Sequence, residues 1–465
     1  MQLQNTSQEK IQEIVLSQKE YFHSGATLDI QFRKAMLHKF REAMNIWEEK
    51  MCEALWLDLH KSSEEAYLTE ISIVNGEISN HLKHISSWSS RRKERTPLKL
   101  FPSRTYTIRE PLGNTLIISP WNYPVQLLLN PLVGAISAGC TAVLKPSPYV
   151  PHVSKVIEEM ISETFEEKYI SVVQGDRHVN QTLFDCRWDL IFFTGSPALA
   201  RYVMASAAQN LTPVILELGG KSPCIIDKYA DINIAARRIA WGKTLNSGQT
   251  CIAPDYIMIH RDVKEEFVKA FAREVHSLHG CDVSADKHYG RIVNDKAFER
   301  ITSYMNGATV LYGGGFDREQ RYIEPTLIET SEMDSPVLNE EIFGPIFPII
   351  TLDDSHKSFK EKVIEYITTH EKPLAFYYFG KESDGWEIIR RTSSGGGCIN
   401  DTIMHIANEN APFGGVGNSG MGHYHGKYSF MAFSHIRSIV VTPTFIDIPF
   451  RYMPYKLFRF VRKIL

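Results

Sequence analysis

The chain has 465 residues, and its 51 basic and 54 acidic side chains give a formal net charge of -3. This length predicts two or three domains. The near balance of charge provides no basic face of the kind that nucleic acid binding requires, so small ligands are the better expectation. The seven cysteines are scattered without a CxxC pair or Cys/His ligand spacing. That pattern argues against a metal site and predicts a reducing compartment, the cytoplasm.

The first part of the chain reads as helical. Across residues 30–58, apolar side chains such as Phe32, Met36 and Phe40 recur at steps of three or four residues. The N-terminus is polar and mixed in charge, without the apolar core of a signal peptide. A basic, Ser-rich stretch over residues 86–97, SSWSSRRKERTP, follows and is interpreted as a solvated connection.

Residues 111–144 contain no Asp, Glu, Lys, Arg or His. A membrane-spanning helix would have such a composition. However, Pro120, Pro124 and Pro131 interrupt the run, which fits a buried strand, a loop and a helix better. We therefore expect no transmembrane span.

Strands and helices are predicted to alternate from this run onward. The expected strands are 114–119, 141–145, 171–173, 189–193, 222–226 and 256–260, and the expected helices are 127–138, 154–165 and 232–245. Such alternation predicts parallel sheets with crossover helices, the setting in which dinucleotide-binding domains are built.

Cys251 follows a Gly-Gln-Thr turn at the end of a helix-like segment, and Pro254 ends regular structure just after it. A catalytic thiol must be accessible and must ionise from an ordinary pKa of about 8.5, whereas a buried structural cysteine needs neither. The turn makes Cys251 a candidate nucleophile and leaves the structural role open.

Two further side chains have unusual surroundings. Glu217 interrupts an apolar strand-like run and precedes Gly219 and Gly220. It is either buried in an ion pair, for example with Lys221, or a general base whose pKa burial raises. Asn122 lies between two prolines at the end of a strand, where it either shapes a turn or donates a fixed hydrogen bond to an oxyanion.

Two segments carry weaker signals for a phosphate or a sugar. Gly195 and Ser196 follow a predicted strand and begin a helix-like run, as in a phosphate-binding loop. Lys145 ends a strand in Leu-Lys-Pro-Ser, where it either hydrogen-bonds ribose hydroxyls or is simply exposed.

Taken together, these segments resemble the aldehyde dehydrogenases, in particular the class 3 or fatty-aldehyde type, over residues 25–440. The matching segments are GNTLIISPWNYP, LKPS, FFTGS, LELGGKSP, GQTCIAPDY, EEIFGP and PFGGVGNSGMGHYHGKYSF. The resemblance implies an α/β fold with an atypical Rossmann-like cofactor domain, a catalytic α/β domain and a small oligomerisation hairpin. The corresponding ranges are 1–88 with 110–218, then 219–418, then 89–109 with 419–445, followed by a basic amphipathic tail over 446–465.

The resemblance also implies the chemistry. The thiol of Cys251 attacks an aldehyde to give a thiohemiacetal, and Asn122 stabilises the oxyanion. Hydride then passes to the nicotinamide and leaves a thioester, which water activated by Glu217 hydrolyses to the carboxylic acid. Thiol and cofactor must share one pocket, because the oxyanion can expel hydride only toward an acceptor already in position.

The same resemblance implies how NAD or NADP is held. Lys145 meets the adenosine ribose, and Gly195 with Ser196 lies near the pyrophosphate at a helix N-terminus. The resemblance further implies Glu341 at the nicotinamide ribose, Phe343 beside the ring and Trp121 lining the cleft. Glu340 is expected at the surface.

Two positions depart from the family pattern. Pro148 replaces the usual Glu after Lys-Pro-Ser, and that acid would repel a 2′-phosphate. We therefore predict that NADP supports at least roughly a hundredth of the catalytic efficiency of NAD, a gap of about 2.7 kcal/mol or less. Ala200 stands where the family often has Gly, which leaves the details of pyrophosphate contact open.

Partners follow from the same resemblance. We expect a medium- or long-chain aliphatic or an aromatic aldehyde as substrate, and a homodimer. The tail packs on its own protein or a partner subunit, or makes peripheral membrane contact. Rival hypotheses are a thiol acyltransferase or esterase that uses Cys251 and Glu217 without redox chemistry, and a non-catalytic protein on the same scaffold. The intact set with Asn122 argues against the latter.

Overall fold

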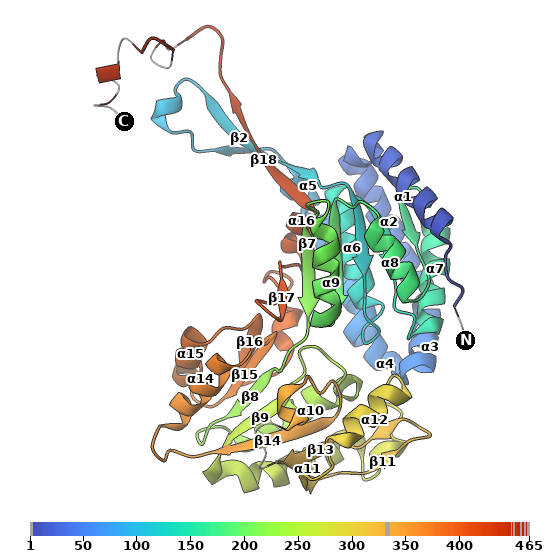
Figure 1. Cartoon of the computed structure of the whole chain (residues 1–465), viewed down its shortest axis with the longest axis vertical. Helices are drawn as coiled ribbons and strands as arrows, with labels where there is room; N and C mark the ends of the chain where they lie inside the picture. The colour runs from blue at the N-terminus through green and yellow to red at the C-terminus, as the bar shows by residue number, and fades with distance from the viewer. Residues whose placement is uncertain are drawn as a thin grey trace.

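The computed structural model describes residues 3–330 and 335–447 and, beyond them, residues 449, 452–455, 458–459 and 462. The chain forms two lobes and a long projecting arm (Figure 1). Half of the tail predicted over 446–465 lies outside the described residues.

The N-terminal helices pack on one lobe. They are α1 (Gln8–His23), α2 (Ile30–Ile46), α3 (Glu48–Leu59), α4 (Ser63–Ala66) and α5 (Ser72–Ser89), with one turn of π-helix, η2 (Tyr67–Ile71), between α4 and α5. Helix α2 shows why they form. The side chain of Asp29 accepts a hydrogen bond from the backbone N–H of Gln31 and caps the helix, while Leu37, Phe40 and Met44 are buried on one face.

The first sheet has the strand order β17-β7-β6-β3-β4-β5 and is parallel except at β17. Its strands are β3 (Asn114–Ile118), β4 (Thr141–Lys145), β5 (Ile170–Val172), β6 (Leu190–Gly195), β7 (Val214–Leu218) and β17 (Gly420–Met421). The helices α6 (Gln126–Ala138), α7 (Pro151–Thr164), α8 (Arg177–Asp185) and α9 (Pro197–Ala208) connect or flank them.

Burial explains the uncharged run over residues 111–144. Every residue of β3 and α6, and of β4 up to Leu144, is buried, so a charge at these positions would lose its hydration without compensation. The run is a strand, a loop and a helix, as predicted. Within the described part of the chain, no helix is both long and apolar enough to cross a bilayer.

The second sheet has the order β10-β13-β14-β9-β8-β15-β16 and is parallel except at β10. Its strands are β8 (Pro223–Ile226), β9 (Tyr256–His260), β10 (Thr309–Tyr312), β13 (Thr326–Glu329), β14 (Ile346–Leu352), β15 (Ala375–Phe379) and β16 (Gly396–Ile399). Its helices are α10 (Ile232–Thr244), α11 (Lys264–His279), α12 (Asp295–Ser303), α13 (Pro336–Asn339), α14 (Phe359–Thr369) and α15 (Glu382–Arg391), with the small β11 (Phe316–Asp317) and β12 (Tyr322–Ile323) alongside.

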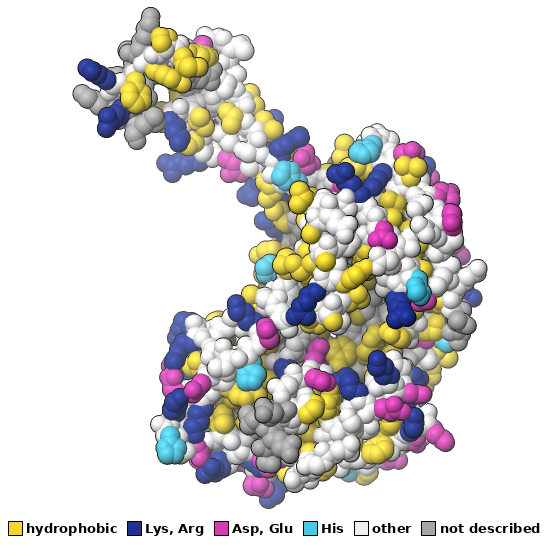
Figure 2. Space-filling view, in the orientation of Figure 1, with side chains coloured by type: hydrophobic (Ala, Val, Ile, Leu, Met, Phe, Trp, Pro, Cys, Tyr) yellow, Lys and Arg dark blue, Asp and Glu magenta, His cyan; other side chains and the backbone are white. Residues whose placement is uncertain are grey.

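The arm is a third, antiparallel sheet of order β1-β2-β18, built from β1 (Arg92–Glu94), β2 (Arg104–Pro111) and β18 (Ser434–Val441), which follows α16 (Lys427–Ala432). The interpretation of residues 86–97 as a solvated connection is therefore wrong in part. These residues end α5 and include β1, which pairs with the next strand, β2, so that Arg92 lies opposite Thr107. Figure 2 shows Lys, Arg and hydrophobic side chains along this arm.

The two lobes meet where β7 leads into β8 through Gly219 and Gly220. In parallel sheets, ligands bind beyond the carboxyl ends of the strands. The carboxyl ends of β3, β4, β6 and β7 face this junction, so a ligand is expected to bind in the cavity there.

Candidate active site

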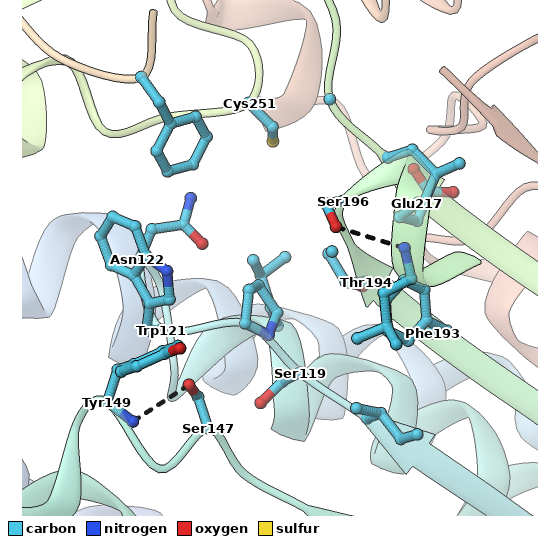
Figure 3. A pocket seen from close by; sticks show the side chains of 18 of the residues that line it. Ser119, Trp121, Asn122, Ser147, Tyr149, Phe193, Thr194, Ser196, Glu217 and Cys251 are labelled. Carbon is cyan, nitrogen blue, oxygen red and sulfur yellow. Dashed lines mark hydrogen bonds between the residues drawn. The ribbon is translucent and has the colours of Figure 1, made fainter. Parts of the chain in front are cut away.

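A cavity of about 520 Å³ lies at the junction, large enough for a small-molecule cofactor and part of a substrate. Segments from both lobes line it (Figure 3). All the predicted site residues line this one cavity: Trp121, Asn122, Lys145, Gly195, Ser196, Glu217, Cys251, Glu341 and Phe343.

Cys251 is presented by a strained turn after α10. Asn246 and Ser247 have φ values of +49° and +51°, a region that non-glycine residues rarely adopt. The side chain of Gln249 holds the turn by donating to the carbonyls of Asn246 and Arg291. The thiol is half-buried, and burial, followed by the charges of Glu341 and Glu217, raises the pKa of Cys251 to about 12. It therefore rests as a neutral thiol.

Asn122 is tied to this turn. Its side-chain amide donates to the Gln249 carbonyl over 3.0 Å, and its own carbonyl accepts from the amide of Asn246 over 2.9 Å. The side-chain Oδ1 is buried and has no partner among the described residues. Because an amide carries two N–H bonds and one is used here, the other remains available toward the thiol.

A buried ion pair supports the Asn122 loop from behind. The ammonium of Lys61 lies 2.6 Å from the carboxylate of Glu70 and donates to the Asn122 carbonyl over 3.2 Å. The other carboxylate oxygen of Glu70 accepts from the backbone N–H groups of Val125 and Gln126, at 2.8 and 3.2 Å. Both side chains are fully buried. Each charge is thus compensated, and together they fix the loop between β3 and α6.

The surroundings of Glu217 are the opposite of those of Glu70. It lies on β7 opposite Gly420 of β17, is 3% exposed, and neither carboxyl oxygen has a partner among the described residues. Burial raises the pKa of Glu217 well above its ordinary value. The alternative of an ion pair with Lys221 is wrong, because Lys221 instead binds Asp255 and the carbonyls of Val337 and Glu340.

Glu341 enters the cavity from the second lobe, whereas Glu340 is exposed and accepts from Tyr304. The backbone N–H of Gly220 donates to Glu341 over 3.1 Å, and a Cβ on Gly219 would lie 2.2 Å from that carboxylate. A side chain at position 219 would therefore displace the Glu341 carboxylate from this position. Burial raises the pKa of Glu341 to about 8.

Two aromatic side chains form one wall of the cavity. The rings of Trp121 and Phe343 meet edge to face, with centroids 5.4 Å apart, although they come from different lobes. Figure 3 shows Trp121 and Asn122 on one side of the cavity, with Glu217 across from them and Cys251 above. A flat ring that enters beside Trp121 would therefore lie near the thiol.

The other cavity residues suit a dinucleotide. Lys145 is buried rather than exposed, and its ammonium donates to the Pro146 carbonyl over 2.8 Å, with donors to spare. Burial lowers the pKa of Lys145 to about 8. Gly195 ends β6, and Ser196 caps α9, which begins at Pro197. A helix N-terminus and a spare buried ammonium are donors that a pyrophosphate and a ribose require, so these residues fit NAD or NADP.

Several cavity residues were not singled out from the sequence: Phe413, Tyr424, Arg300, Arg177 and Asn180. The hydroxyl of Tyr424 is buried without a partner among the described residues, and burial, then the charge of Glu217, raises its pKa well above the ordinary value. The segment GHYHGKYSF is part of the family resemblance, but nothing in its local sequence predicts that Tyr424 lines the cavity. In the described ranges no cluster of three or more His, Cys, Asp or Glu side chains suits a metal ion.

Comparison with known proteins places these features in context. Residues 1–439 match the model of the aldehyde dehydrogenase family. The 4,4'-diaponeurosporen-aldehyde dehydrogenase of Staphylococcus aureus is 44% identical over 441 residues, which cover 94% of this chain and 95% of that protein. The dimeric NADP-preferring aldehyde dehydrogenase of Canis lupus familiaris is 40% identical over 440 residues, covering 94% and 96%. A solved structure of substrate-bound Staphylococcus aureus AldH, 43% identical, superposes with a TM-score of 0.95 and covers 98% of this chain and 99% of its own.

Proposed function

Because this chain belongs to the aldehyde dehydrogenase family, whose members oxidise aldehydes to acids with NAD or NADP, we propose that Cys251 is its nucleophile, Asn122 its oxyanion donor and Glu217 its deacylating base. One observation carries the proposal. The three side chains line a single cavity, and the carboxyl of Glu217 is buried there without a hydrogen-bond partner among the described residues.

In the first step, the sulfur of Cys251 bonds to the aldehyde carbon, and the carbonyl π electrons move to oxygen. The spare N–H of Asn122 stabilises that oxygen, with the backbone N–H of Cys251 as the second donor. Because the thiol has a pKa of about 12, it must lose its proton as the bond forms, and that proton passes to water as the H⁺ that the overall oxidation releases. The product of the step is a thiohemiacetal.

Hydride then leaves the thiohemiacetal carbon as the carbonyl re-forms, which gives the thioester of Cys251, and bound NAD(P) would supply the hydride acceptor. The chain's own residues would set the geometry: Lys145 at the adenosine ribose, Gly195 and Ser196 at the pyrophosphate, and Glu341 at the nicotinamide ribose. The rings of Trp121 and Phe343 line the cleft and exclude water from the reacting carbon.

In the second step, Glu217 takes a proton from water, the water oxygen bonds to the thioester carbon, and the carbon–sulfur bond breaks. The acid leaves and Cys251 regains a proton. A carboxylate with an ordinary pKa would be a weak base, and burial moves the pKa of Glu217 upward, in the direction that makes it a better one. A carboxyl without fixed partners is also free to turn toward the water.

For the substrate, we propose a medium- or long-chain aliphatic or an aromatic aldehyde. Trp121, Phe413 and Tyr424 line the cavity and favour an apolar chain or ring. The names of similar proteins, which include 4,4'-diaponeurosporen-aldehyde and indole-3-acetaldehyde dehydrogenases, point the same way.

The organisation of the chain is proposed on the same basis. Residues 1–88 with 110–218 would bind the cofactor, 219–418 would carry the catalytic thiol, and 89–109 with 419–445 would join two subunits in a homodimer. The first range holds the first sheet except β17, the second holds the second sheet, and the third holds β17 and most of the arm. All seven cysteines are free thiols, which suits the reducing cytoplasm. Light scattering after gel filtration would test the dimer.

Rapid-mixing kinetics at the absorbance of the reduced nicotinamide tests the proposal. Cys251→Ala should abolish reduction and keep cofactor binding, whereas Cys186→Ala, a matched change at a half-buried thiol outside the cavity, should leave the rate unchanged. Glu217→Gln should keep a burst of one hydride per site and slow later turnover. Equal loss of burst and turnover would refute its role in deacylation. No reduction of NAD or NADP with any aldehyde from hexanal to benzaldehyde would favour the acyltransferase or esterase.

A further inference from the structure

The turn before Cys251 is strained where it starts, at Asn246, which has a φ of +49°. Such a conformation persists only where the surrounding structure holds it. The backbone N–H of Asn246 donates to the carboxylate of Glu65 over 2.9 Å. The side chain of Asn246 donates in turn to the backbone carbonyls of Asn122 and Gln249, at 2.9 and 3.2 Å. Glu65 therefore holds the residue that joins the Cys251 turn to the Asn122 loop.

Glu65 belongs to a short helical segment that fixes its own position. It lies in α4, where its backbone N–H donates to the hydroxyl of Ser62 over 3.2 Å and its carbonyl accepts from the hydroxyl of Thr69 over 2.7 Å. The π-helical turn η2 follows directly and contains Glu70. Because a π-turn spans about five residues, it favours Glu65 and Glu70 on one side of the segment. Both carboxylates accordingly reach loops of the candidate site, Glu65 the Cys251 turn and Glu70 the start of α6.

The two proposed oxyanion donors come from different parts of the chain. Asn122 follows β3 in the first lobe, whereas Cys251 follows α10 of the second. They can stabilise one oxygen only if both N–H groups point at the same place. The helical segment behind them contacts both sides, since Lys61 donates to the Asn122 carbonyl over 3.2 Å and Glu65 holds the Cys251 turn. One segment thus sets the distance between the two donors.

We infer that Glu65 is a positioning residue for attack on the aldehyde, holding the Cys251 turn so that the backbone N–H of Cys251 and the amide of Asn122 converge on one oxygen. The inference rests on the proposed function and adds to it a residue that does not line the cavity.

The charge of Glu65 guides the choice of variant. Loss of hydration raises the pKa of Glu65 to about 7, against the opposing charge of Lys61. The neutral form of this side chain is therefore well populated near neutral pH. Glutamine is also neutral and keeps an oxygen that accepts from the Asn246 N–H, so it is the conservative replacement.

Two replacements of similar size separate the hydrogen bond from packing, because Glu65→Gln keeps an acceptor and Glu65→Met does not. With hexanal and saturating NAD or NADP, Glu65→Met should slow the hydride burst by about 10–100-fold, the effect of a small misplacement of reacting groups. Glu65→Gln should stay within about threefold of the wild type. Glu64→Met, the same change at the adjacent exposed carboxylate, is the matched control and should leave the burst unchanged. All three variants should keep the wild-type affinity for the cofactor.

Alkylation of Cys251 by iodoacetamide, followed by peptide mass spectrometry, distinguishes positioning from loss of the turn. Alkylation needs the thiol but forms no oxyanion, so its rate in Glu65→Met should stay within about threefold of the wild type. If Glu65→Met does not fold, Glu65→Ala also removes the acceptor and takes its place in both measurements.

Three results would overturn the inference and leave the proposed oxidation intact. They are an unchanged burst in Glu65→Met, an equal slowing in Glu65→Gln, and a parallel loss of burst and alkylation, which would mean that the turn has come apart. A wild-type chain that gives no hydride burst would instead refute the proposed function itself.

Discussion

Glu70 and Glu217 are both buried carboxylates beside the candidate active site, yet their surroundings are opposite. Glu70 has a cation at 2.6 Å and two backbone donors, whereas Glu217 has no partner among the described residues. A compensated buried charge holds structure, whereas burial without a partner raises the pKa of the Glu217 carboxyl and suits it to exchanging a proton. Satisfied polar groups thus surround a small set of unsatisfied ones, and the reactive chemistry is expected at the latter.

The largest effect should come from breaking the compensated pair. Lys61→Met leaves the Glu70 carboxylate buried without its cation, so we expect a loss of about 3–5 kcal/mol in the free energy of unfolding. Urea denaturation measures it. The double variant Lys61→Met/Glu70→Gln removes both charges and should recover more than half of the loss. Equal destabilisation of the two proteins would contradict the comparison.

Asn122 belongs to both environments, because Lys61 of the ion pair holds its backbone carbonyl while its side-chain amide keeps one N–H for the proposed oxyanion. Asn122→Ala keeps the backbone carbonyl, so it should cost only about 1 kcal/mol of stability. The hydride burst at saturating cofactor should slow by about 10²–10³-fold. Asn180→Ala, at the far end of the cavity, is the control and should leave the burst unchanged.

The raised pKa of Glu341 should be visible in the pH dependence of the melting temperature. Its pKa rises from 4.5 unfolded to about 8 folded, so the folded chain holds a proton that the unfolded chain has lost. The stability it contributes is complete below pH 4.5 and is lost as the pH rises through about 8. From about pH 5 to about pH 8, the melting temperature of the wild-type chain should therefore fall more than that of Glu341→Gln. Parallel curves from thermal scans would argue against a raised pKa.

The smallest effect on stability should come from Glu217→Gln. No hydrogen-bond partner among the described residues is lost, so the free energy of unfolding should change by less than about 1 kcal/mol, although turnover falls. Glu70→Gln, the same chemical change at the compensated site, should cost several times more. A large destabilisation in Glu217→Gln would reveal a structural role.

What could be predicted from the sequence was mostly local. The strand ending at Lys145, the strand-like run that contains Glu217 and the turn before Cys251 are each signalled by consecutive residues, and each lies where expected. The family resemblance linked them, and the structure brings the nominated side chains into one cavity. Their chemical roles stay predictions.

The rest depends on contacts between distant residues, which no local pattern encodes. Lys61 and Glu70 look like ordinary charges on helical segments until folding places them behind Asn122. The strand β1 is short and fully exposed, so it has no alternation of buried and exposed residues to reveal it. Tyr424 belongs to a recognisable segment, but its position beside the cavity follows from the return of the chain to β7 through β17.

That return affects the order in which parts of the candidate site can form during translation. Gly420 of β17 pairs with Glu217, so the strand that carries the candidate base is closed by residues translated long after it. A nascent chain can already contain Cys251 and the strands β3 to β7 while the edge beside Glu217 is still open to water. The buried carboxyl without a described partner, which we propose as the deacylating base, therefore forms only when β17 docks on β7.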